Sequence, residues 1–385
     1  MNMIYGEPTV RVGLSEEGGF GLHPHGSYDI NAAEDVVTYT PMEQDAFMEV
    51  TGIRIGRGFH WDSKRTMRYG GIIQLMRIKE RTLLLNMLKA EQYLQCVVGS
   101  EMHPDAPTEF VKAHAVIARS WLLRMITSKR KALREMSVNP LITWTEADAH
   151  QYFDVCPDDH CQRYQGLDAI TPGSKAAVEA TRGLILIDEQ NDIADTRYSK
   201  CCGGKTELFS TCWADKDYPY LTSINDPYCH PDRLASALKA HPSLLKDYDA
   251  ATDEYYTWEQ EVPEALIRHN LKERFNTDIG SITDLKIVKQ GPSGRVYELE
   301  IVGTTGSVVL GKELSIRRLL SETHLLSSAF TIKKRSGLFI LRGRGWGHGV
   351  GLCQIGAAVM AVEGKTCSEI LDFYYPHTRL SKVYE

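Results

Sequence analysis

The chain has 385 residues, enough for about two or three folding units, and 43% of them are hydrophobic and 24% charged. These fractions are typical of a globular protein with a substantial core, and they exclude a disordered, collagen-like or low-complexity chain. A net charge of −6 argues against nucleic acid as a partner, because polyanion-binding proteins usually carry a basic excess. The sequence has neither an apolar run of about 18 residues nor a basic stretch followed by an apolar one at its start, so we expect no transmembrane segment and no signal peptide.

Strands are predicted first in chain order, at Val10–Leu14, Gly52–Phe59 and Gly71–Ile78, where apolar residues alternate between glycines. A helix is predicted over Asp105–Ser128, because apolar residues recur there at steps of three and four and form one stripe. A helix over Leu352–Glu363 is expected near the end of the chain, followed by a shorter one that begins at a capping box.

Four regions follow from this pattern. Strands and helices without regular βαβ alternation predict an α+β fold. The predicted regions are a β-rich region at 1–92, a first core part at 93–232, a charged helical insertion at 233–276, and a second β-rich core part with C-terminal helices at 277–385.

A single carboxylate, Glu101, ends an apolar run just before the predicted helix. As a structural residue it would complement the positive end of that helix's dipole. As a functional residue it would be a general acid that apolar neighbours such as Val98 and Met102 keep protonated. The two interpretations conflict, since a helix N-terminus favours the charged form. The functional one therefore requires desolvation to outweigh the dipole.

Two thiols and two imidazoles lie within twelve residues, at His150, Cys156, His160 and Cys161. Thiolate and imidazole are the donors that zinc prefers, although the spacing is not that of a standard zinc finger. The alternative is a disulfide or buried free thiols. The chain has nine cysteines, an odd number, so they cannot all pair within one chain.

Glycine-rich segments occur at 198–207 and 343–354. Gly203-Gly204 allows a sharp turn or the close approach of a ligand, and an ordinary hairpin turn is the alternative. From Gly343 to Gly351, glycine occupies every second position, which in an extended backbone would leave one face without side chains. Such a bare face would admit another element of the protein or a flat ligand such as a sugar, on which Trp346 could stack.

Taken in order, these segments resemble the family of stage II sporulation protein D (SpoIID) and the amidase enhancer (LytB). The resemblance rests on Tyr93–Glu101, Lys112–Ser120, His160–Gly166, Cys202–Glu207 with Trp213, and Gly343–Gly356. Cys201 and Cys353 stand where the family pattern has Thr or Ser, and residues 233–276 have no clear counterpart.

The resemblance implies a bacterial lytic transglycosylase, a lyase that cleaves peptidoglycan glycan strands whose peptide stems have been removed, between N-acetylmuramic acid and N-acetylglucosamine. Glu101 would be its single acid/base and Arg119 a supporting residue on the following helix. A substrate groove with mixed strands and helices around it is expected, in a protein that works in the cell envelope or outside the cytoplasm.

Further roles are implied in the same way. Zn²⁺ would be held by Cys156 and Cys161 with His150 or His160, and would shape the wall of the groove. Residues expected near the substrate are Tyr198, Lys200, Gly203, Gly204, Lys205, Thr206, Trp346, His348 and Gln354. The alternatives are a non-catalytic glycan-binding activator of a cell-wall amidase, which would be its partner, and a zinc hydrolase.

Overall fold

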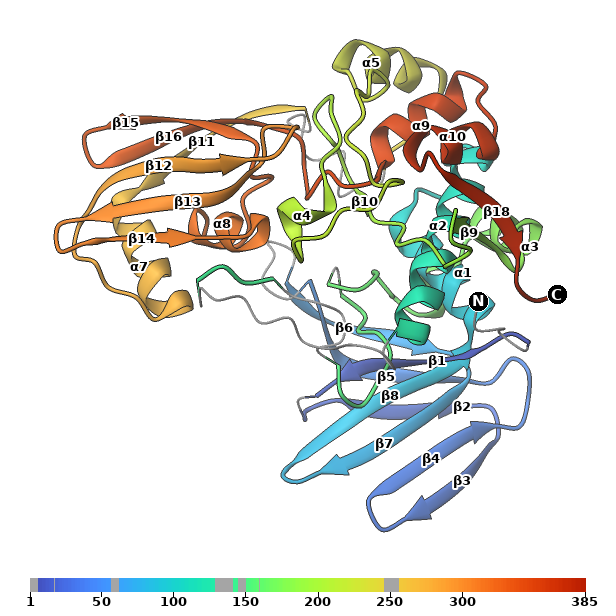
Figure 1. The fold of residues 1–385 in the computed structure, drawn as a ribbon. Helices are drawn as coiled ribbons and strands as arrows, with labels where there is room; N and C mark the ends of the chain where they lie inside the picture. The colour runs from blue at the N-terminus through green and yellow to red at the C-terminus, as the bar shows by residue number, and fades with distance from the viewer. Residues whose placement is uncertain are drawn as a thin grey trace. The chain divides into compact units, whose positions relative to one another are not determined.

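The computed structural model describes residues 6–16, 18–56, 62–128, 141–144, 150–158, 160–245 and 256–385. The chain divides into two units. Unit 1 comprises Met1–Ala132, Ala147–Asp195 and Arg379–Glu385, and unit 2 comprises Leu133–Glu146 and Thr196–Thr378. Strands and helices occur in both units, which confirms the α+β fold (Figure 1). Among the described residues, no helix has the length and apolar character needed to cross a membrane.

Unit 1 begins with two antiparallel sheets. The first has the order β1 (Thr9–Ser15), β8 (Arg81–Lys89), β7 (Ile72–Ile78), β4 (Val36–Pro41) and β3 (Tyr28–Ala33). The second has the order β2 (Gly21–His25), β5 (Phe47–Ile55) and β6 (Ser63–Tyr69). The strands predicted at Val10–Leu14 and Gly71–Ile78 are confirmed. The strand predicted at Gly52–Phe59 coincides with the end of β5, and residues 57–59 lie outside the described residues.

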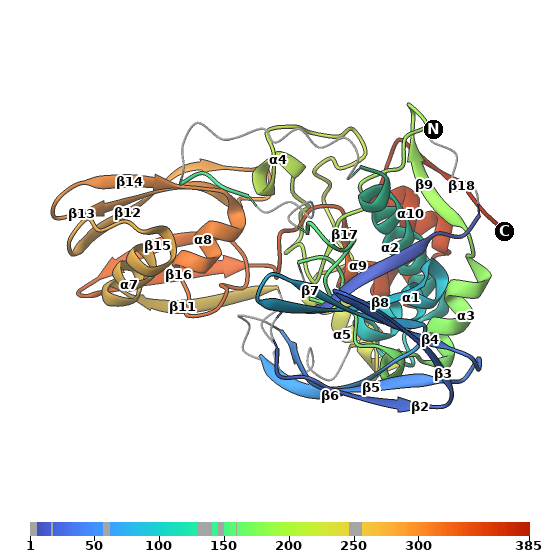
Figure 2. The same ribbon diagram turned by 90° about the horizontal axis from the view of Figure 1, so that it is seen from below.

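Three helices of unit 1 pack against one another, namely α1 (Ala90–Glu101), α2 (Thr108–Ser128) and α3 (Pro172–Ala180) (Figures 1 and 2). Helix α2 confirms the predicted helix, and its apolar stripe is buried. A short 3₁₀ turn, η2 (Leu167–Ala169), contacts α1. Strand β9 (Leu184–Asp188) pairs with β18 (Thr378–Lys382), so a segment near residue 380 completes this unit.

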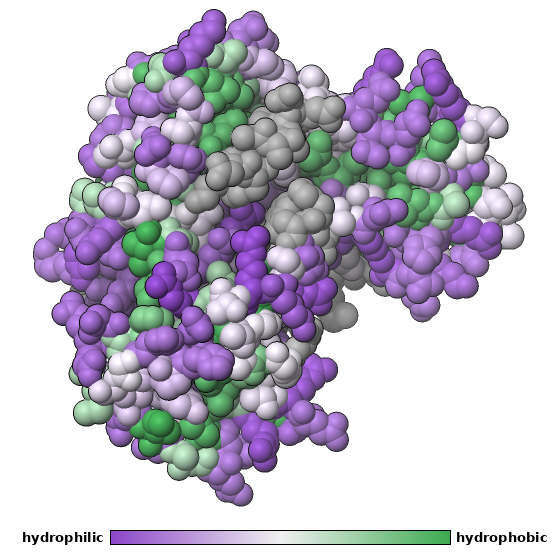
Figure 3. All heavy atoms as spheres, turned by 180° about the vertical axis from the view of Figure 1, so that it is seen from behind, coloured by the Kyte–Doolittle hydropathy of each residue, from purple (hydrophilic) through white to green (hydrophobic). Residues whose placement is uncertain are grey.

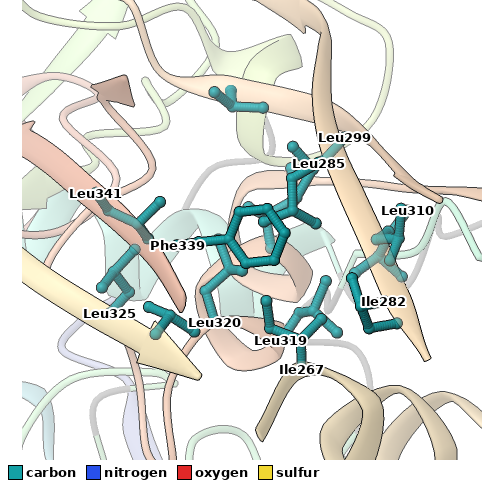
Figure 4. Close-up of a cluster of buried hydrophobic side chains, with 14 of the residues drawn as sticks. Ile267, Ile282, Leu285, Leu299, Leu310, Leu319, Leu320, Leu325, Phe339 and Leu341 are labelled. Carbon is teal, nitrogen blue, oxygen red and sulfur yellow. The ribbon is translucent and has the colours of Figure 1, made fainter. Parts of the chain in front are cut away.

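A large core in unit 2 lies between two three-stranded sheets and two helices. One sheet has the order β12 (Ile282–Gln290), β13 (Val296–Gly303) and β14 (Ser307–Leu310), and the other β11 (Thr257–Pro263), β16 (Leu338–Arg344) and β15 (Phe330–Arg335). The helices are α7 (Glu264–Phe275) and α8 (Glu313–Leu319). Phe339 lies at the centre of this core, among leucine side chains that include Leu285 of β12, Leu299 of β13 and Leu319 of α8 (Figure 4).

The predicted helical insertion at 233–276 contains a strand as well as helices. Helix α5 (Pro231–Ala240) and helix α7 account for the helical part. Strand β11 lies between them, with Trp258 and Val262 buried and the glutamates between them exposed. Its charged side chains face solvent while its backbone pairs with β16, about eighty residues away in the sequence. The charged composition of residues 257–263 therefore predicted a helix, but this segment forms a strand because its backbone pairs with β16.

The remaining elements of unit 2 are β10 (Tyr198–Ser199), α4 (Phe209–Cys212), β17 (Leu352–Cys353), α9 (Gln354–Val362) and α10 (Cys367–Tyr374). The predicted capping box is confirmed, because Thr366 Oγ1 accepts from the Glu369 N–H and the Glu369 carboxylate accepts from the Thr366 N–H. On the face drawn in Figure 3, hydrophilic side chains cover most of the described surface, and hydrophobic ones appear in scattered patches.

Candidate functional site

Glu101 is the last residue of helix α1 and is partly buried. Its Oε1 atom accepts a hydrogen bond of 3.4 Å from the backbone N–H of Arg163. The sequence interpretation placed this carboxylate at the start of the next helix, but α2 begins only at Thr108. Glu101 therefore lies at the negative end of the α1 dipole, which disfavours a carboxylate. The dipole and desolvation thus both oppose ionisation of Glu101, whereas the hydrogen bond from the Arg163 N–H favours it.

Close packing fixes the end of α1. A Cβ atom on Gly99 would lie 2.0 Å from the carbonyl oxygen of Ala169, so only glycine fits there. Ser100 Oγ donates to the Cys96 carbonyl at 2.7 Å and accepts from the Gln165 N–H at 3.1 Å. The segment around Arg163 is consequently held against the turn of α1 that carries Glu101.

Arg119 is fully buried in α2 and forms a two-pronged ion pair with Glu91 of α1, with both N–O distances at 2.8 Å. The Tyr384 hydroxyl also donates to Glu91, at 2.6 Å. Burial tends to raise the pKa of Glu91, but the hydrogen bonds and charge of Arg119 lower it overall. Arg119 thus joins α2 to the helix that ends in Glu101, and a positioning role in catalysis stays a prediction.

The four predicted metal-ligating side chains come together in unit 1. One donor atom from each of His150, Cys156, His160 and Cys161 lies within 4.8 Å of all the others. Cys161 Sγ is 3.3 Å from His150 Nε2 and 3.4 Å from His160 Nδ1, and Cys156 Sγ is 3.8 Å from His160 Nδ1. Donors bound to one tetrahedral Zn²⁺ would be separated by ~3.5 Å for nitrogen and sulfur, so this group could hold a metal ion.

The charge state of this cluster also suits a cation. Hydrogen bonding from Cys161 contributes most to lowering the pKa of Cys156 below its ordinary value, and His150 and His160 lower this pKa further. A thiolate is the form of cysteine that binds metals. The cluster leads directly into the segment that contacts α1, because Gln162 follows Cys161. Gln162 donates to the Ala118 carbonyl at 3.2 Å and accepts from the Tyr93 hydroxyl at 3.3 Å.

In unit 2 the two glycine-rich segments lie side by side. Strand β10 pairs in parallel with β17, and isolated bridges join Cys201 to Trp346 and Glu207 to Val350. The Ser199 hydroxyl accepts from the Gly349 N–H at 3.1 Å. Residues 198–207 and 346–353 are therefore joined to each other by backbone pairing at several positions.

The alternating glycines do not form a regular extended strand, because Gly345, Gly347, Gly349 and Gly351 all have a positive φ. Their bare faces are occupied by the protein itself. A Cβ atom on Gly349 would lie 2.4 Å from Arg295 Cζ, and one on Gly351 would lie 2.1 Å from a backbone carbonyl oxygen. The sequence left open whether the bare face meets another element of the protein or a flat ligand such as a sugar. At Gly349 and Gly351 it meets another element of the protein.

The predicted substrate-contacting residues divide by exposure. Partly exposed are Tyr198, Lys200, Gly204, Lys205, Trp346 and His348, whereas Gly203, Thr206 and Gln354 are buried. The Thr206 hydroxyl is used internally, since it accepts from the Ile224 N–H and donates to the Thr222 carbonyl. Their contact with a substrate stays a prediction.

His348 illustrates how the segment from Gly343 to Gly351, called the glycine-rich ribbon below, is held in place. Its ring packs edge-on against Trp213, with ring centroids 5.0 Å apart, and its Nδ1 accepts from the Val350 N–H. Burial and the nearby charges of Arg197 and Arg295 lower the pKa of His348 well below its usual range. The imidazole is therefore neutral near pH 7 and acts as a hydrogen-bond acceptor within the ribbon.

A second group of ligand-type side chains was missed by the sequence interpretation. Cys202, Asp226, Cys229 and Cys353 are all buried, and one atom from each lies within 4.8 Å of the others. They are spread over about 150 residues, so no local spacing connects them. The one available signal was that Cys353 departs from the family pattern.

Two parts of the chain match family models, and most of the chain is similar to known proteins. Residues 79–187 match the family model described as stage II sporulation protein, and residues 207–351 match one described as a domain of unknown function, DUF8618. An uncharacterized protein of Brachyspira hyodysenteriae is 28% identical over 325 residues, which cover 83% of this chain and 75% of that protein.

Two further relatives come from Bacillus subtilis. Stage II sporulation protein D is 28% identical over 296 residues, covering 76% of this chain and 74% of the relative. The amidase enhancer is 26% identical over 284 residues, covering 68% of this chain and 38% of the relative.

Fold and site together define an α+β protein in which a carboxylate at a helix end lies against a Cys/His segment, within one unit that also matches the family model. The other unit carries a glycine-rich ribbon. Residues 79–187 match the stage II sporulation protein family, and the chain is similar to stage II sporulation protein D and to the amidase enhancer over 76% and 68% of its length.

Proposed function

We propose that the protein acts on the bacterial cell wall as a lytic transglycosylase, which cleaves glycan strands between N-acetylmuramic acid and N-acetylglucosamine. The observation that carries this proposal is the position of Glu101 at the C-terminal end of α1, where the carboxyl is partly buried. The helix dipole there opposes ionisation, as a general acid requires. Relatives named stage II sporulation protein D and amidase enhancer support a role at the wall.

One carboxyl group is sufficient for this reaction. Glycosidases that activate water generally use two carboxylates. In a lytic reaction the Glu101 carboxyl first protonates the oxygen of the glycosidic bond, whose cleavage releases the N-acetylglucosamine-side alcohol. The 6-hydroxyl of the muramic acid residue attacks its own C1, and Glu101 accepts the hydroxyl proton. The product is a 1,6-anhydro sugar, and the carboxyl returns to its starting protonation state.

We propose further that His150, Cys156, His160 and Cys161 hold Zn²⁺, which suits a two-nitrogen, two-sulfur donor set at tetrahedral distances. With four protein donors the site would be closed, as structural zinc sites are. Its contribution would be to fix the segment that continues through Gln162 to Arg163, and thereby the donor that faces Glu101.

A glycan digest tests the catalytic assignment. Peptidoglycan strands stripped of peptide stems are incubated with the wild type and with Glu101→Gln, and the products are identified by mass spectrometry. We expect anhydro-muramic products from the wild type and a loss of at least about 100-fold in the variant, because the amide has no proton to transfer. Glu179→Gln is the matched control, since Glu179 is an exposed glutamate on α3. Undiminished product from Glu101→Gln would refute the mechanism.

The second candidate function is a glycan-binding activator of a cell-wall amidase, favoured by the similarity to a protein named amidase enhancer. It predicts that the wild type sediments with the glycan but yields no anhydro product, with or without added Zn²⁺. The same protein would increase product release by an added amidase, and Glu101→Gln would do so equally well. A zinc hydrolase, in contrast, would lose turnover on chelation and release reducing ends without anhydro sugar.

A further inference from the structure

The buried group Cys202, Asp226, Cys229 and Cys353 in unit 2 lies outside everything assigned above. Cys202 and Cys229 are each 1% exposed, Asp226 is 2% exposed and Cys353 is fully buried. The sulfur atoms of Cys202 and Cys229 are 3.4 Å apart, and all four donor atoms lie within 4.8 Å of one another. Sulfurs bound to one tetrahedral Zn²⁺ would be ~3.8 Å apart, so little movement is needed to enclose an ion.

Backbone amides are directed at these sulfur atoms. The Cys202 N–H and the Gly356 N–H donate to Cys353 Sγ at 3.3 and 3.4 Å, and the Gly204 N–H donates to Cys229 Sγ at 3.3 Å. A neutral thiol is a weak acceptor, whereas a thiolate attracts several N–H donors. Such amide-to-sulfur hydrogen bonds surround metal-bound thiolates. Cys353 also caps the N-terminus of α9, where the helix dipole favours a negative charge.

Asp226 is held with one oxygen next to the thiols. Its Oδ1 accepts from the Tyr228 N–H at 2.9 Å, and its Oδ2 accepts from the Tyr374 hydroxyl at 2.9 Å and from Cys202 Sγ at 3.3 Å. Within the described ranges of the chain, neither lysine nor arginine forms an ion pair with this carboxylate. A buried group of thiols and a carboxylate without a cationic side chain is costly unless a cation or protons neutralise it.

From this geometry we infer that unit 2 holds a second, structural Zn²⁺, bound by Cys202, Cys229 and Cys353 and completed by Asp226. Thiolate ligands select zinc over the hard cations magnesium and calcium, and four protein donors leave no open position for a substrate or water. The Tyr374 hydroxyl would then orient the carboxylate ligand from outside, as the outer partners of metal ligands do.

The site would connect three distant parts of unit 2. Cys202 lies in the turn after β10, Cys229 follows a short turn from Asp226, and Cys353 is at the junction of the glycine-rich ribbon and α9. Close packing leaves no room for a larger residue here, because a Cβ atom on Gly356 would lie 2.5 Å from Asp226 Oδ2. The ion would thereby hold the ribbon against the segment 198–204, independently of any reaction at Glu101.

Zinc content of the full-length protein tests the inference. Cys156→Ser/Cys161→Ser removes the thiols of the unit 1 cluster, and we expect one equivalent of tightly bound Zn²⁺ to remain, measured by elemental analysis and native mass spectrometry. Adding Cys229→Ser to that background should remove it. Adding Cys367→Ser, a cysteine on α10, should not. Absence of zinc from the Cys156→Ser/Cys161→Ser protein would overturn the proposal.

A spectroscopic measurement covers the case in which Cys229→Ser does not fold. The Cys156→Ser/Cys161→Ser protein, with all unit 2 ligands intact, is titrated with Co²⁺ under reducing conditions. We expect a 1:1 endpoint with sulfur-to-cobalt charge-transfer absorption and the strong visible bands of a tetrahedral ion. A spectrum without them would count against the site.

A disulfide between Cys202 and Cys229 is the competing explanation. Alkylation of the same denatured protein without a reductant should modify all seven of its remaining cysteines, which is nine minus two. Modification of only five, with Cys202 and Cys229 protected, would show a disulfide and refute the metal site.

The fourth ligand is tested separately, because Cys201 interacts with Cys229 and Cys353 and is a second possible donor. We expect Asp226→Asn to weaken zinc binding at least about tenfold in a chelator competition and Cys201→Ser to leave it within about twofold. The opposite result would overturn the assignment of Asp226 and give the position to Cys201.

Discussion

At the scale of single residues, the ion pair of Arg119 and Glu91 is the clearest case of a contact that the sequence could not predict. Arg119 was singled out because it matches a family position, and its spacing from Glu101 suggested support from the next helix. Its partner is Glu91, ten residues before Glu101 on α1. Nothing in the sequence around Glu91 distinguishes it from an exposed first-turn glutamate, because its burial depends on Tyr384 and α2.

Replacing Arg119 with Met should destabilise the protein by about 3–5 kcal/mol at pH 7, because it leaves the Glu91 carboxylate buried and unpaired. Urea unfolding followed by circular dichroism measures this change. The double variant Glu91→Gln/Arg119→Met is the control and should recover most of the loss. A cost below about 1 kcal/mol in the single variant would mean that the pair does not hold the helices together.

The same pair predicts a dependence of stability on pH. Arg119 lowers the pKa of Glu91 below its ordinary value of 4.5, so the folded state binds this proton less readily than the unfolded state. The stabilisation is therefore fully present above about pH 4.5 and is lost as the pH falls through the lowered pKa. The free energy difference between the wild type and Glu91→Gln/Arg119→Met should shrink over that range. A constant difference from pH 7 to pH 3 would contradict the assignment.

At the scale of elements, helix periodicity was informative for α2 and uninformative for α1. Helix α2 has a clear apolar stripe, whereas α1 buries residues on most of its circumference, so no stripe appears in its sequence. Glu101 was consequently assigned to the start of the second helix and not to the end of the first. The role of Glu101 stays a prediction, but its position differs from the expected one: it lies at the negative end of the α1 dipole and not at the positive end of the α2 dipole.

For the glycine-rich ribbon, too, the spacing of residues did not determine the backbone conformation. A spacing of two indicates an extended strand, yet alternate residues with a positive φ have the same spacing. The partner that requires glycine at position 349 is Arg295, 54 residues earlier, so local pattern could indicate the constraint but not its cause.

Two glycine substitutions separate steric conflict from backbone strain. Gly349→Ala should cost about 2–4 kcal/mol, because the new Cβ would meet Arg295 and the backbone φ of +75° is unfavourable for alanine. Gly337→Ala has a similar φ of +70° but open space, so it should cost only about 1 kcal/mol. Thermal unfolding of both variants measures the difference. Equal costs would show that the contact with Arg295 is unimportant.

At the scale of the whole molecule, the residues that the structure describes include one cluster of metal-ligand side chains in each unit. Composition divided the chain into consecutive regions, whereas unit 1 is built from three separate stretches of sequence. The local Cys/His segment was recognisable because its members lie within twelve residues. The cluster of Cys202, Asp226, Cys229 and Cys353 was not, because only the tertiary fold brings its members together.

Removal of metal should therefore loosen two separate regions. After treatment with a chelator, hydrogen–deuterium exchange should increase in residues 150–166 of unit 1 and in residues 198–229 and 353–356 of unit 2. The α7 and β12–β14 region lacks both clusters and serves as the internal control, whose exchange should not change. An increase confined to residues 150–166 would mean that the unit 2 cluster does not depend on a metal.

The pairing of β18 with β9 has a consequence for the order in which the protein matures on the ribosome. Ile185 and Ile187 of β9 pack with Leu123 and with Tyr384, whose hydroxyl also reaches Glu91. A nascent chain that has grown only to Thr378 contains all of unit 2 but not the strand that covers this side of unit 1. During translation, the helices of unit 1 therefore acquire this partner only after the segment that follows Thr378 has been made.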